Sequence, residues 1–335
     1  MGKIKIGICG YGNIGEAVKE VIANFPDMEL NAIFTRRNPA ELQPHITSNV
    51  AVNSFKFIEN WKDDIDVMIM CGGSATDLPV QVPEVAKHFN TVDSFDTHAK
   101  IPSYYEAVNA SAVAAKKTSV ISGGWDPGLF SLMRLYANAI LPQGGIDGKP
   151  YTFWGKDRRG LSQGHSNAVR KIEGVKNAVQ YTIPIQEAMD RVRNGENPDL
   201  TAREKHLREC FVVPEDGADT AAIEEQIKTM PNYFADYDTI VHFITEEELK
   251  NEHSEMAHGG FVIHGCQTGK GHKEIMEFSL KLDSNPEFTA SVLLTLARAA
   301  YKMNQAGQYG AKTMFDIPPA MLSAMSAEEL REQYL

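Results

Sequence analysis

The sequence predicts an α/β protein with a Rossmann-type, doubly wound parallel sheet and a mixed α+β second domain. Two observations predict the sheet. Short apolar runs alternate with helix-periodic segments over residues 4–121. A glycine-rich hexamer at residues 10–15 also joins the first apolar run to the first helical pattern. After about residue 125 longer and more irregular strand patterns begin, which predicts the second domain.

The first domain starts with alternating isoleucines, from Ile4 to Ile8, in an apolar run that ends at Gly10. Residues 14–22 then place apolar side chains at helical spacing. Further short apolar runs lie at residues 30–34, 67–70, 89–92 and 119–121, with helical patterns at 80–88 and 104–117. Strands that alternate with helices pair in parallel through right-handed crossovers, so an open parallel sheet is expected.

In the second domain we expect antiparallel strands and short helices. The strands are predicted at residues 181–184, 210–213 and 239–243, and the helices at 221–230 and 246–251. A long helix is predicted to begin near Pro286 and to stop at Gly307. We therefore expect a dinucleotide-binding domain at residues 1–122, completed by about 300–335, and a substrate-binding and dimerisation domain at 123–299.

Composition limits the class of protein. The 335 residues include 33 Lys and Arg against 44 Asp and Glu, a net charge of −11, and 43% are hydrophobic. A chain of this kind buries a core, and its acidic balance argues against nucleic-acid partners. No run of about 18 apolar residues and no signal-peptide pattern occur, so we expect no membrane partner. Four scattered cysteines without a CxxC suit a reducing cytoplasm.

The glycine loop is the first candidate site, and it reads Gly10-Tyr11-Gly12-Asn13-Ile14-Gly15. The first glycine of this pattern permits a tight turn, the second lets the backbone approach a pyrophosphate, and the third allows close helix–sheet contact. The following helix supplies oriented N–H groups for the anion. A plain strand–helix turn remains the alternative, but the flanking strand and helix favour a dinucleotide.

The end of the second strand predicts which dinucleotide is bound. An NAD site places an acidic residue there, whereas this chain reads Thr35-Arg36-Arg37. Two guanidinium groups and a hydroxyl suit a 2′-phosphate, so NADP is the predicted cofactor. The alternative is that both arginines are solvated surface charges.

A third loop of small residues follows the run at 67–70 and reads Cys71-Gly72-Gly73-Ser74-Ala75. Loops at the carboxyl ends of parallel strands line the ligand crevice, so this loop is predicted to contact the nicotinamide half. We interpret Cys71 as a packing residue rather than a nucleophile, because no histidine motif accompanies it.

Three polar segments are candidates for the substrate site: residues 91–98, 122–128 and 153–166. Asp96 and Asp126 follow predicted strands, so both are expected at the sheet edge, where paired carboxylates hold an ammonium group and take protons. The aromatic rings of Trp125 and Phe153 are expected to shield the reacting carbon. Asp126 has an equally good structural interpretation as the N-cap of a helix that begins with proline.

These motifs together resemble the meso-diaminopimelate dehydrogenase family, the NADP-dependent D-amino-acid oxidoreductases of bacterial lysine biosynthesis. The matching stretches occur in order between residues 10 and 291, and they include GYGNIG, FTRR, MCGGSATD, TVDSFDTH, SGGWDPG, TFWG, LSQGHS, QYTIP and LKLDSNPEFTAS. The resemblance implies an oxidoreductase acting on CH–NH2, in which hydride passes from the D-centre of meso-2,6-diaminopimelate to NADP. L-2-Amino-6-oxopimelate, which cyclises to tetrahydrodipicolinate, and ammonia are the implied products.

The resemblance also implies residue roles. It assigns Asp96, Trp125, Asp126 and Phe153 to the D-amino centre, with Asp126 as our candidate base. Gln163 and Gly164 are implied at the same end, and the distal L-amino-acid end is implied to be held by Thr182, Arg208, His258 and Asn285. From the pattern alone, Arg208 could be one of many solvated charges, Thr182 an ordinary strand residue and Asn285 a helix N-cap.

Some features depart from the family or point elsewhere. Residues 144–150 and 156–160 are predicted insertions, and Asn167 stands where relatives carry Asp. The spacing of His258, His264, Cys266 and His272 matches no standard zinc pattern, so no metal is expected. The alternatives are another NADP-dependent dehydrogenase acting on a sugar or an amino-acid semialdehyde, or a non-catalytic NADP sensor. Exposed strand edges and the family both suggest a homodimer or larger homo-oligomer.

Overall fold

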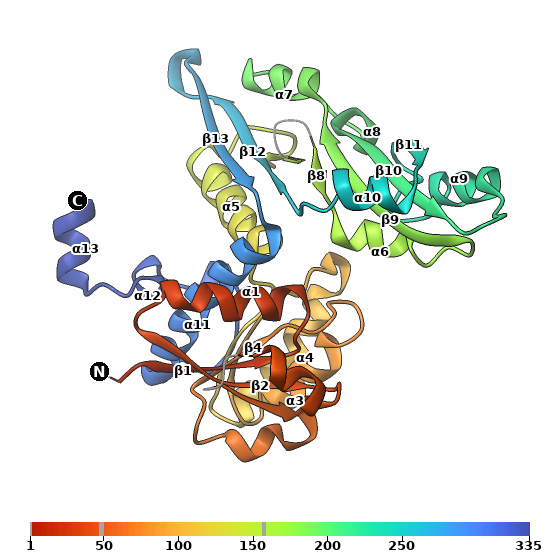
Figure 1. Ribbon diagram of the computed structural model, residues 1–335. Helices are drawn as coiled ribbons and strands as arrows, with labels where there is room; N and C mark the ends of the chain where they lie inside the picture. Colours follow the sequence, from red (N-terminus) through yellow and green to blue (C-terminus); the bar gives the residue numbers. More distant parts are fainter. Residues whose placement is uncertain (1, 47–49, 156–158) are drawn as a thin grey trace. The chain divides into compact units, whose positions relative to one another are not determined.

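The computed structural model describes residues 2–46, 50–155 and 159–335 (Figure 1). The chain forms two compact units. Unit 1 comprises Met1–Leu132 and Pro286–Leu335, and unit 2 comprises Met133–Asn285. Among the described residues, none of the helices combines the length and the hydropathy needed to cross a membrane.

Unit 1 is built on a parallel sheet, as the sequence predicts, and this sheet has seven strands. Its order is β14-β6-β5-β4-β1-β2-β3, so the first six strands follow the dinucleotide-fold order 3-2-1-4-5-6. The strands are β1 (Ile4–Cys9), β2 (Met28–Thr35), β3 (Ala51–Ser54), β4 (Val67–Met70), β5 (Asn90–Asp93), β6 (Thr118–Val120) and β14 (Gly310–Lys312).

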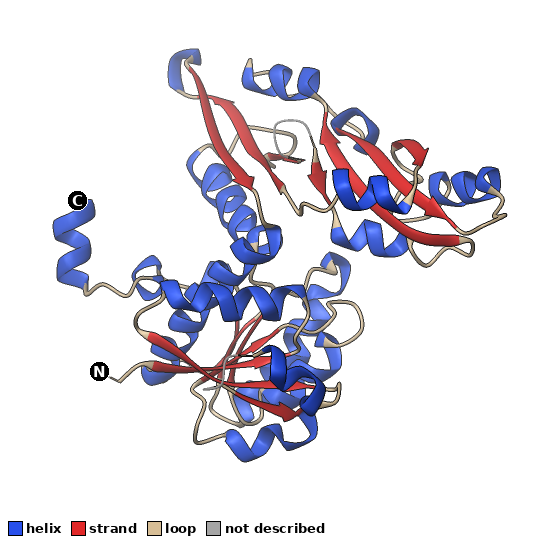
Figure 2. Ribbon diagram, in the orientation of Figure 1, coloured by secondary structure: helices blue, strands red, loops and turns tan. Residues whose placement is uncertain are grey.

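Helices cover both faces of this sheet (Figure 2). Side chains alternate along each strand, so Val67 and Ile69 pack on one face of β4 while Met68 and Met70 pack on the other. The first face is covered by α1 (Asn13–Val21) and α11 (Asn285–Gln305), and the second by α3 (Leu78–Val85) and α4 (Ile101–Ala114). Three short helices complete the unit: α2 (Pro39–Leu42), α12 (Pro319–Leu322) and α13 (Ala327–Tyr334).

A partly buried ion pair ties α11 to the turn before β2. The Arg298 guanidinium donates through Nε to Asp27 Oδ2 at 2.6 Å and through Nη2 to Asp27 Oδ1 at 2.7 Å. Its Nη1 donates to the carbonyl of Leu322 at 2.8 Å. This pairing lowers the pKa of Asp27. Three segments of unit 1 that are far apart in the chain are therefore joined by one side chain.

Unit 2 contains two smaller sheets. The first has the order β11-β10-β9-β8 and the second the order β13-β12-β7. Their strands are β7 (Tyr151–Trp154), β8 (Gly160–Leu161), β9 (Val175–Pro184), β10 (His206–Pro214), β11 (Asp238–Phe243), β12 (His258–Gln267) and β13 (Lys273–Leu282). The helices of this part are α5 (Phe130–Ile140), α6 (Gln163–Val169), α7 (Gln186–Arg193), α8 (Ala202–Lys205), α9 (Thr220–Lys228) and α10 (Glu246–Glu252).

One predicted pairing is wrong. β9 and β10 pair antiparallel, as expected, but β11 runs parallel to β10, with Cys210 opposite Val241. The helix α9 lies in the connection between β10 and β11. It brings the chain back to the end of the sheet where β10 begins, so β11 runs in the same direction as β10. The long hairpin of β12 and β13 and the strands β3, β7, β8 and β14 were not predicted as strands.

The two units divide at residues 132/133 and 285/286, whereas the sequence placed the boundaries at 122/123 and about 300. The difference has a structural reason at the second boundary. Most of α11 packs in the core of unit 1, with Leu293, Leu296 and Ala300 against the sheet, so this helix belongs to unit 1 from its second residue onward.

Candidate active site

The turn between β1 and α1 has the geometry that its glycines predict. Gly10 adopts φ +95°, a conformation that L side chains rarely adopt. A Cβ added to Gly15 would lie 2.2 Å from the carbonyl oxygen of Gly10, so only glycine fits there. At Gly12, the N-cap of α1, no atom of the described residues lies within 4 Å of an added Cβ. The turn thus leaves open space over the start of a helix, where an anion binds.

The two arginines after β2 lie beside this turn. Arg37 donates from Nη2 to the carbonyl oxygen of Tyr11. Arg36 donates from Nη2 to Asp77 Oδ2 at 2.7 Å, and its side chain is 64% exposed. The Thr35 hydroxyl oxygen accepts from the backbone N–H of Arg37 at 3.0 Å. The three side chains therefore place two cationic groups next to the glycine loop, and the guanidinium of Arg36 stays accessible to a ligand.

The loop after β4 connects these arginines to the loop after β5. Asp77 accepts from the backbone N–H of Gly73 at 3.0 Å as well as from Arg36. Ser74 donates its hydroxyl to Asp96 and accepts from the backbone N–H of Asp96 at 3.0 Å. Burial raises the pKa of the Cys71 thiol, which agrees with its interpretation as a packing residue.

A buried carboxylate, Asp93, lies at the end of β5 and was not among the predicted site residues. Its side chain accepts hydrogen bonds from the backbone N–H groups of Phe95 and Ser122 and from the Tyr104 hydroxyl. Burial raises the pKa of Asp93 to about 6, and these three hydrogen bonds oppose the rise. Predicting this residue from the sequence would require knowing that the ends of β5 and β6 lie next to α4.

The segment 125–129 does not form the helix capped by Asp126 that is the alternative interpretation of this segment. Asp126 has φ −156° and ψ 107°, Pro127 follows a cis peptide bond, and α5 begins only at Phe130. The interpretation of Asp126 as an N-cap with proline at the first helical position is therefore wrong, because Pro127 and Gly128, which would form the first turn, are not helical. Trp125 is 9% exposed, and its ring packs edge-on against Phe130 with centroids 5.2 Å apart.

In unit 2, Arg208 is buried rather than solvated, which corrects the alternative based on its charged neighbours. It is 4% exposed and lies opposite Thr182 in the antiparallel pair of β10 and β9. Its Nη1 donates to the Thr182 hydroxyl, and its guanidinium lies over the Tyr237 ring, 4.0 Å from the centroid. Its Nε has no hydrogen-bond partner among the described residues. A buried cation with a donor left over is suited to binding an anion.

Phe153 does not lie where the prediction needs it. It is fully buried and packs in a cluster with Tyr151, Met189 and Ile263, so its ring does not reach the surface of unit 2. Successive side chains of a strand face opposite sides, so the next residue, Trp154, faces away from that core. Trp154 is partly exposed, and its ring stacks on His206 at 5.1 Å.

The remaining predicted residues are also in unit 2. Gln163 donates to the sulfur of Met256 at 3.2 Å, and an added Cβ at Gly164 meets no described atom within 4 Å. His258 is 6% exposed at the start of β12. Asn285 is the first residue of α11. The predicted insertion at residues 156–160 lies largely outside the described residues.

The candidate metal ligands His258, His264 and Cys266 lie along β12, and His272 lies in the turn that follows. His258 and His264 are six residues apart in β12, about 20 Å at the usual rise of a strand, which is too far to share an ion. Within residues 2–46, 50–155 and 159–335, no group of three or more His, Cys, Asp or Glu side chains could hold a metal.

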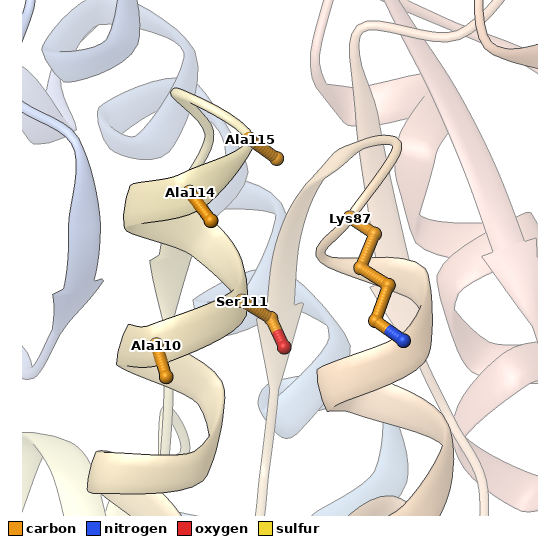
Figure 3. A pocket seen from close by; sticks show the side chains of 5 residues that line it. All are labelled: Lys87, Ala110, Ser111, Ala114 and Ala115. Atoms are coloured by element: carbon orange, nitrogen blue, oxygen red, sulfur yellow. The ribbon is translucent and has the colours of Figure 1, made fainter.

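A hollow on unit 1 lies apart from these residues (Figure 3). Lys87, Ser111 and three alanines of the α4 region line it. Lys87 shortly precedes β5, and the last residues of α4 shortly precede β6, so the hollow lies near the amino ends of these strands. The glycine loop and both aspartates follow strands at the opposite, carboxyl edge, where open α/β sheets bind ligands.

Comparisons with known proteins agree on one family. The family model of the diaminopimelic acid dehydrogenase C-terminal domain matches residues 124–284. The meso-diaminopimelate D-dehydrogenase of Ureibacillus thermosphaericus is 60% identical over 335 residues, which is 100% of both chains. A mutant meso-diaminopimelate dehydrogenase from Clostridium tetani E88, solved with DAP, is 52% identical with a TM-score of 0.92 over 99% of this chain and 100% of its own. An engineered D-amino acid dehydrogenase bound to NADP+ is 42% identical with a TM-score of 0.88 over the same shares.

Gly12 and Gly15 allow a matched test of the glycine loop. Gly12→Ala should leave the melting temperature of the cofactor-free protein unchanged, because its Cβ meets no described atom, but should weaken NADPH binding about tenfold or more by filling the space for the phosphates. Gly15→Ala should lower the melting temperature itself, because its Cβ meets the Gly10 carbonyl. Thermal melting and NADPH fluorescence titration check both. Equal effects of the two variants on melting would contradict the assignment.

Proposed function

This chain belongs to the meso-diaminopimelate D-dehydrogenase family, and we propose that it oxidatively deaminates the D-centre of meso-2,6-diaminopimelate with NADP. The reversible reaction gives L-2-amino-6-oxopimelate, which cyclises to tetrahydrodipicolinate, and ammonia, and it serves lysine biosynthesis. The observation that carries this proposal is the 60% identity to a curated relative over the whole of both chains.

The cofactor site follows from unit 1. The open space over Gly12 fits a pyrophosphate, and the exposed guanidinium of Arg36, together with Thr35 and Arg37, fits a 2′-phosphate. Tyr11, Asn13 and Ile14 complete the glycine loop, and Cys71, Gly72, Gly73, Ser74 and Ala75 complete the nicotinamide side. When bound, NADP accepts the hydride.

The D-centre is assigned to residues of unit 1. Asp96 and Asp126 provide carboxylates that hold the ammonium group, and Asp126 accepts its proton, directly or through a water, before hydride leaves the carbon. Trp125 supports this region through its packing on Phe130. Water then hydrolyses the imine to the oxo acid and ammonia. The fixed position of Asp96 is supported by its two hydrogen bonds with Ser74.

The distal L-amino-acid end is assigned to unit 2. Arg208 supplies a buried guanidinium with an unpartnered Nε for a carboxylate, and Thr182 supports it. The C. tetani mutant solved with DAP carries substitutions at Gln, Thr, Arg, His and Asn residues spaced 19, 26, 50 and 27 positions apart. The same residue types stand here at the same spacing, as Gln163, Thr182, Arg208, His258 and Asn285. Gly164 adjoins the first of these. The sixth substituted residue, a proline just before the histidine, is Ala257 here.

We assign to Trp154 the shielding role that was predicted for Phe153. It faces away from the core cluster of unit 2, whereas Phe153 is part of that cluster. His206 accepts a hydrogen bond from the Trp154 backbone N–H at 2.8 Å and stacks on its ring. Burial lowers the pKa of His206 to about 3, so the imidazole is neutral and keeps its acceptor at working pH.

A homodimer or larger homo-oligomer and a cytoplasmic location complete the proposal. Large apolar side chains are exposed on α5, at Leu135, Tyr136 and Ile140, and such a surface is typical of subunit contacts. All four cysteines are free thiols, as is usual in a reducing compartment. Light scattering of the purified protein measures the oligomeric state.

The substrate assignment predicts a stereochemical result. The wild-type protein should reduce NADP with meso-diaminopimelate and not with the L,L isomer, because only the meso form carries a D-centre. In reverse, NADPH oxidation should require ammonia. Absorbance at the nicotinamide band measures both. NADPH binding without turnover of the meso form would contradict the proposal and favour a sensor.

The cofactor assignment predicts the effect of Arg36→Ala. Loss of the guanidinium removes a charge-assisted contact to the 2′-phosphate, so the NADP/NAD ratio of kcat/KM should fall about tenfold or more. The value of kcat/KM with NAD is the internal control and should change little. An unaltered ratio would show that Arg36 does not select the cofactor.

The distal-end assignment predicts that Arg208→Met raises KM for meso-diaminopimelate at least about 30-fold, because a buried charged partner of the carboxylate is lost. The Kd for NADPH should stay within about threefold. Arg203→Ala is the matched control, because Arg203 lies in the same charged segment but is exposed beside Asp238. Equal KM values for the two variants would remove Arg208 from the site.

The assignment of Asp126 as the base predicts that Asp126→Asn loses about 100-fold or more in kcat from pH 7 to 11, because an amide cannot accept the proton. Steady-state rates across that range, with NADPH binding measured in parallel, test it. A variant with near-normal kcat throughout would exclude Asp126 as the base.

A further inference from the structure

We propose that Asp93 is a positioning residue for this reaction: its buried carboxylate holds the loop that carries Asp96 and the loop that carries Trp125 and Asp126 in a fixed relation. The inference rests on the proposed function, since the two loops matter for the D-centre only if that reaction occurs here. It concerns a side chain of unit 1 that the assigned roles leave unused.

The first part of the argument is how Asp93 spans two neighbouring strands. Its Oδ1 accepts from the backbone N–H of Phe95 at 2.9 Å, within its own loop, and from the backbone N–H of Ser122 at 3.1 Å, in the loop after β6. The carbonyl oxygen of Asp93 also accepts from the N–H of Gly123 at 2.7 Å. One residue thus binds both loops at the carboxyl edge of the sheet.

A third donor fixes the carboxylate from α4. The Tyr104 hydroxyl donates to Asp93 Oδ2 at 2.7 Å, and the Tyr104 ring packs on Phe95 with centroids 4.2 Å apart. Tyr104 is 4% exposed and Asp93 is 0% exposed. The side chain therefore does not reach a ligand, and both of its oxygens are engaged by the protein.

The partners of Asp93 lie close in the chain to the residues assigned to the reaction. Asp96 lies three positions after Asp93 and is tied to Ser74 in the loop after β4. Ser122 adopts φ +54°, an uncommon conformation for a residue with a side chain, and its N–H bond to Asp93 supports that conformation. The segment 93–96 after β5 is therefore hydrogen-bonded on one side to the loop after β4 and on the other to the loop after β6.

A charged residue is more than the local turn requires. A serine or asparagine would satisfy the N–H of Phe95, and burying a carboxylate carries a cost that raises the pKa of Asp93 to about 6. The ionised form accepts three hydrogen bonds and makes each of them stronger than a neutral acceptor would. That cost is consistent with a need for rigid loops, since a small displacement of a reacting group slows catalysis greatly.

The test compares Asp93→Ala, which removes all three acceptor contacts, with Asp93→Asn, which keeps an oxygen for the two backbone N–H groups. Tyr104→Phe is a third variant that keeps the carboxylate and removes one donor. For each, stopped-flow absorbance gives the first-turnover rate of NADPH formation with meso-diaminopimelate. The rate is divided by the concentration of bound cofactor, so that unfolded protein does not contribute.

We expect Asp93→Ala to lose about tenfold or more in this rate while its Kd for NADPH stays within about threefold. Asp93→Asn should recover a large part of the loss, and Tyr104→Phe should fall between wild type and Asp93→Ala. A purely structural role would lower the melting temperature without changing the rate per bound cofactor.

A rate within threefold of wild type for a folded Asp93→Ala would overturn the inference. If Asp93→Ala does not fold, wild-type rates in both Asp93→Asn and Tyr104→Phe would overturn it equally. Failure of the proposed function shows itself earlier and separately, because the wild-type protein would then give no NADPH with meso-diaminopimelate.

Discussion

Backbone hydrogen bonds between parallel strands impose one direction on β1, β2, β4, β5 and β6, so the loops that follow them all start at the same edge of the unit 1 sheet. The glycine turn, the arginine pair, the small-residue loop and both aspartates come from five separate stretches of sequence, and this constraint gathers them. Their polar side chains then bind one another, as Arg36 binds Asp77 and Ser74 binds Asp96. The strand direction therefore determines where the candidate site lies, and the residues of the loops determine which groups the site contains.

Two buried charges show opposite ways of being accommodated. The Asp93 carboxylate accepts three hydrogen bonds: one from each of two loops and one from the helix α4. Arg208 is equally buried, yet its Nε is left without a partner among the described residues. A buried charge whose hydrogen bonds are all made within the protein stabilises the local structure, whereas a buried charge with an unused donor is suited to binding a ligand. This difference underlies the two separate roles that we propose for Asp93 and Arg208.

Sequence patterns were sufficient where the cause is local. The alternation of Ile4, Ile6 and Ile8, and the glycines of the first turn, identify β1 and the start of α1 without any tertiary information. They were insufficient where the cause is distant. Recognising that Phe153 is a core residue requires knowing which face of β7 meets the core. The parallel pairing of β11 depends on the helix before it, and Asp93 depends on partners from β6 and α4.

Unit 1 is discontinuous in the chain, and this has a consequence for its biosynthesis. The edge strand β14 and the helix α11, with its Arg298–Asp27 ion pair, come from the last 50 residues, while unit 2 is complete by residue 285. A ribosome adds about 5–20 residues per second, so the first 132 residues wait about 10–40 seconds for the segments that cover one face and one edge of their sheet. During that interval the nascent nucleotide fold exposes apolar surface and an unpaired strand, as a client of chaperones does.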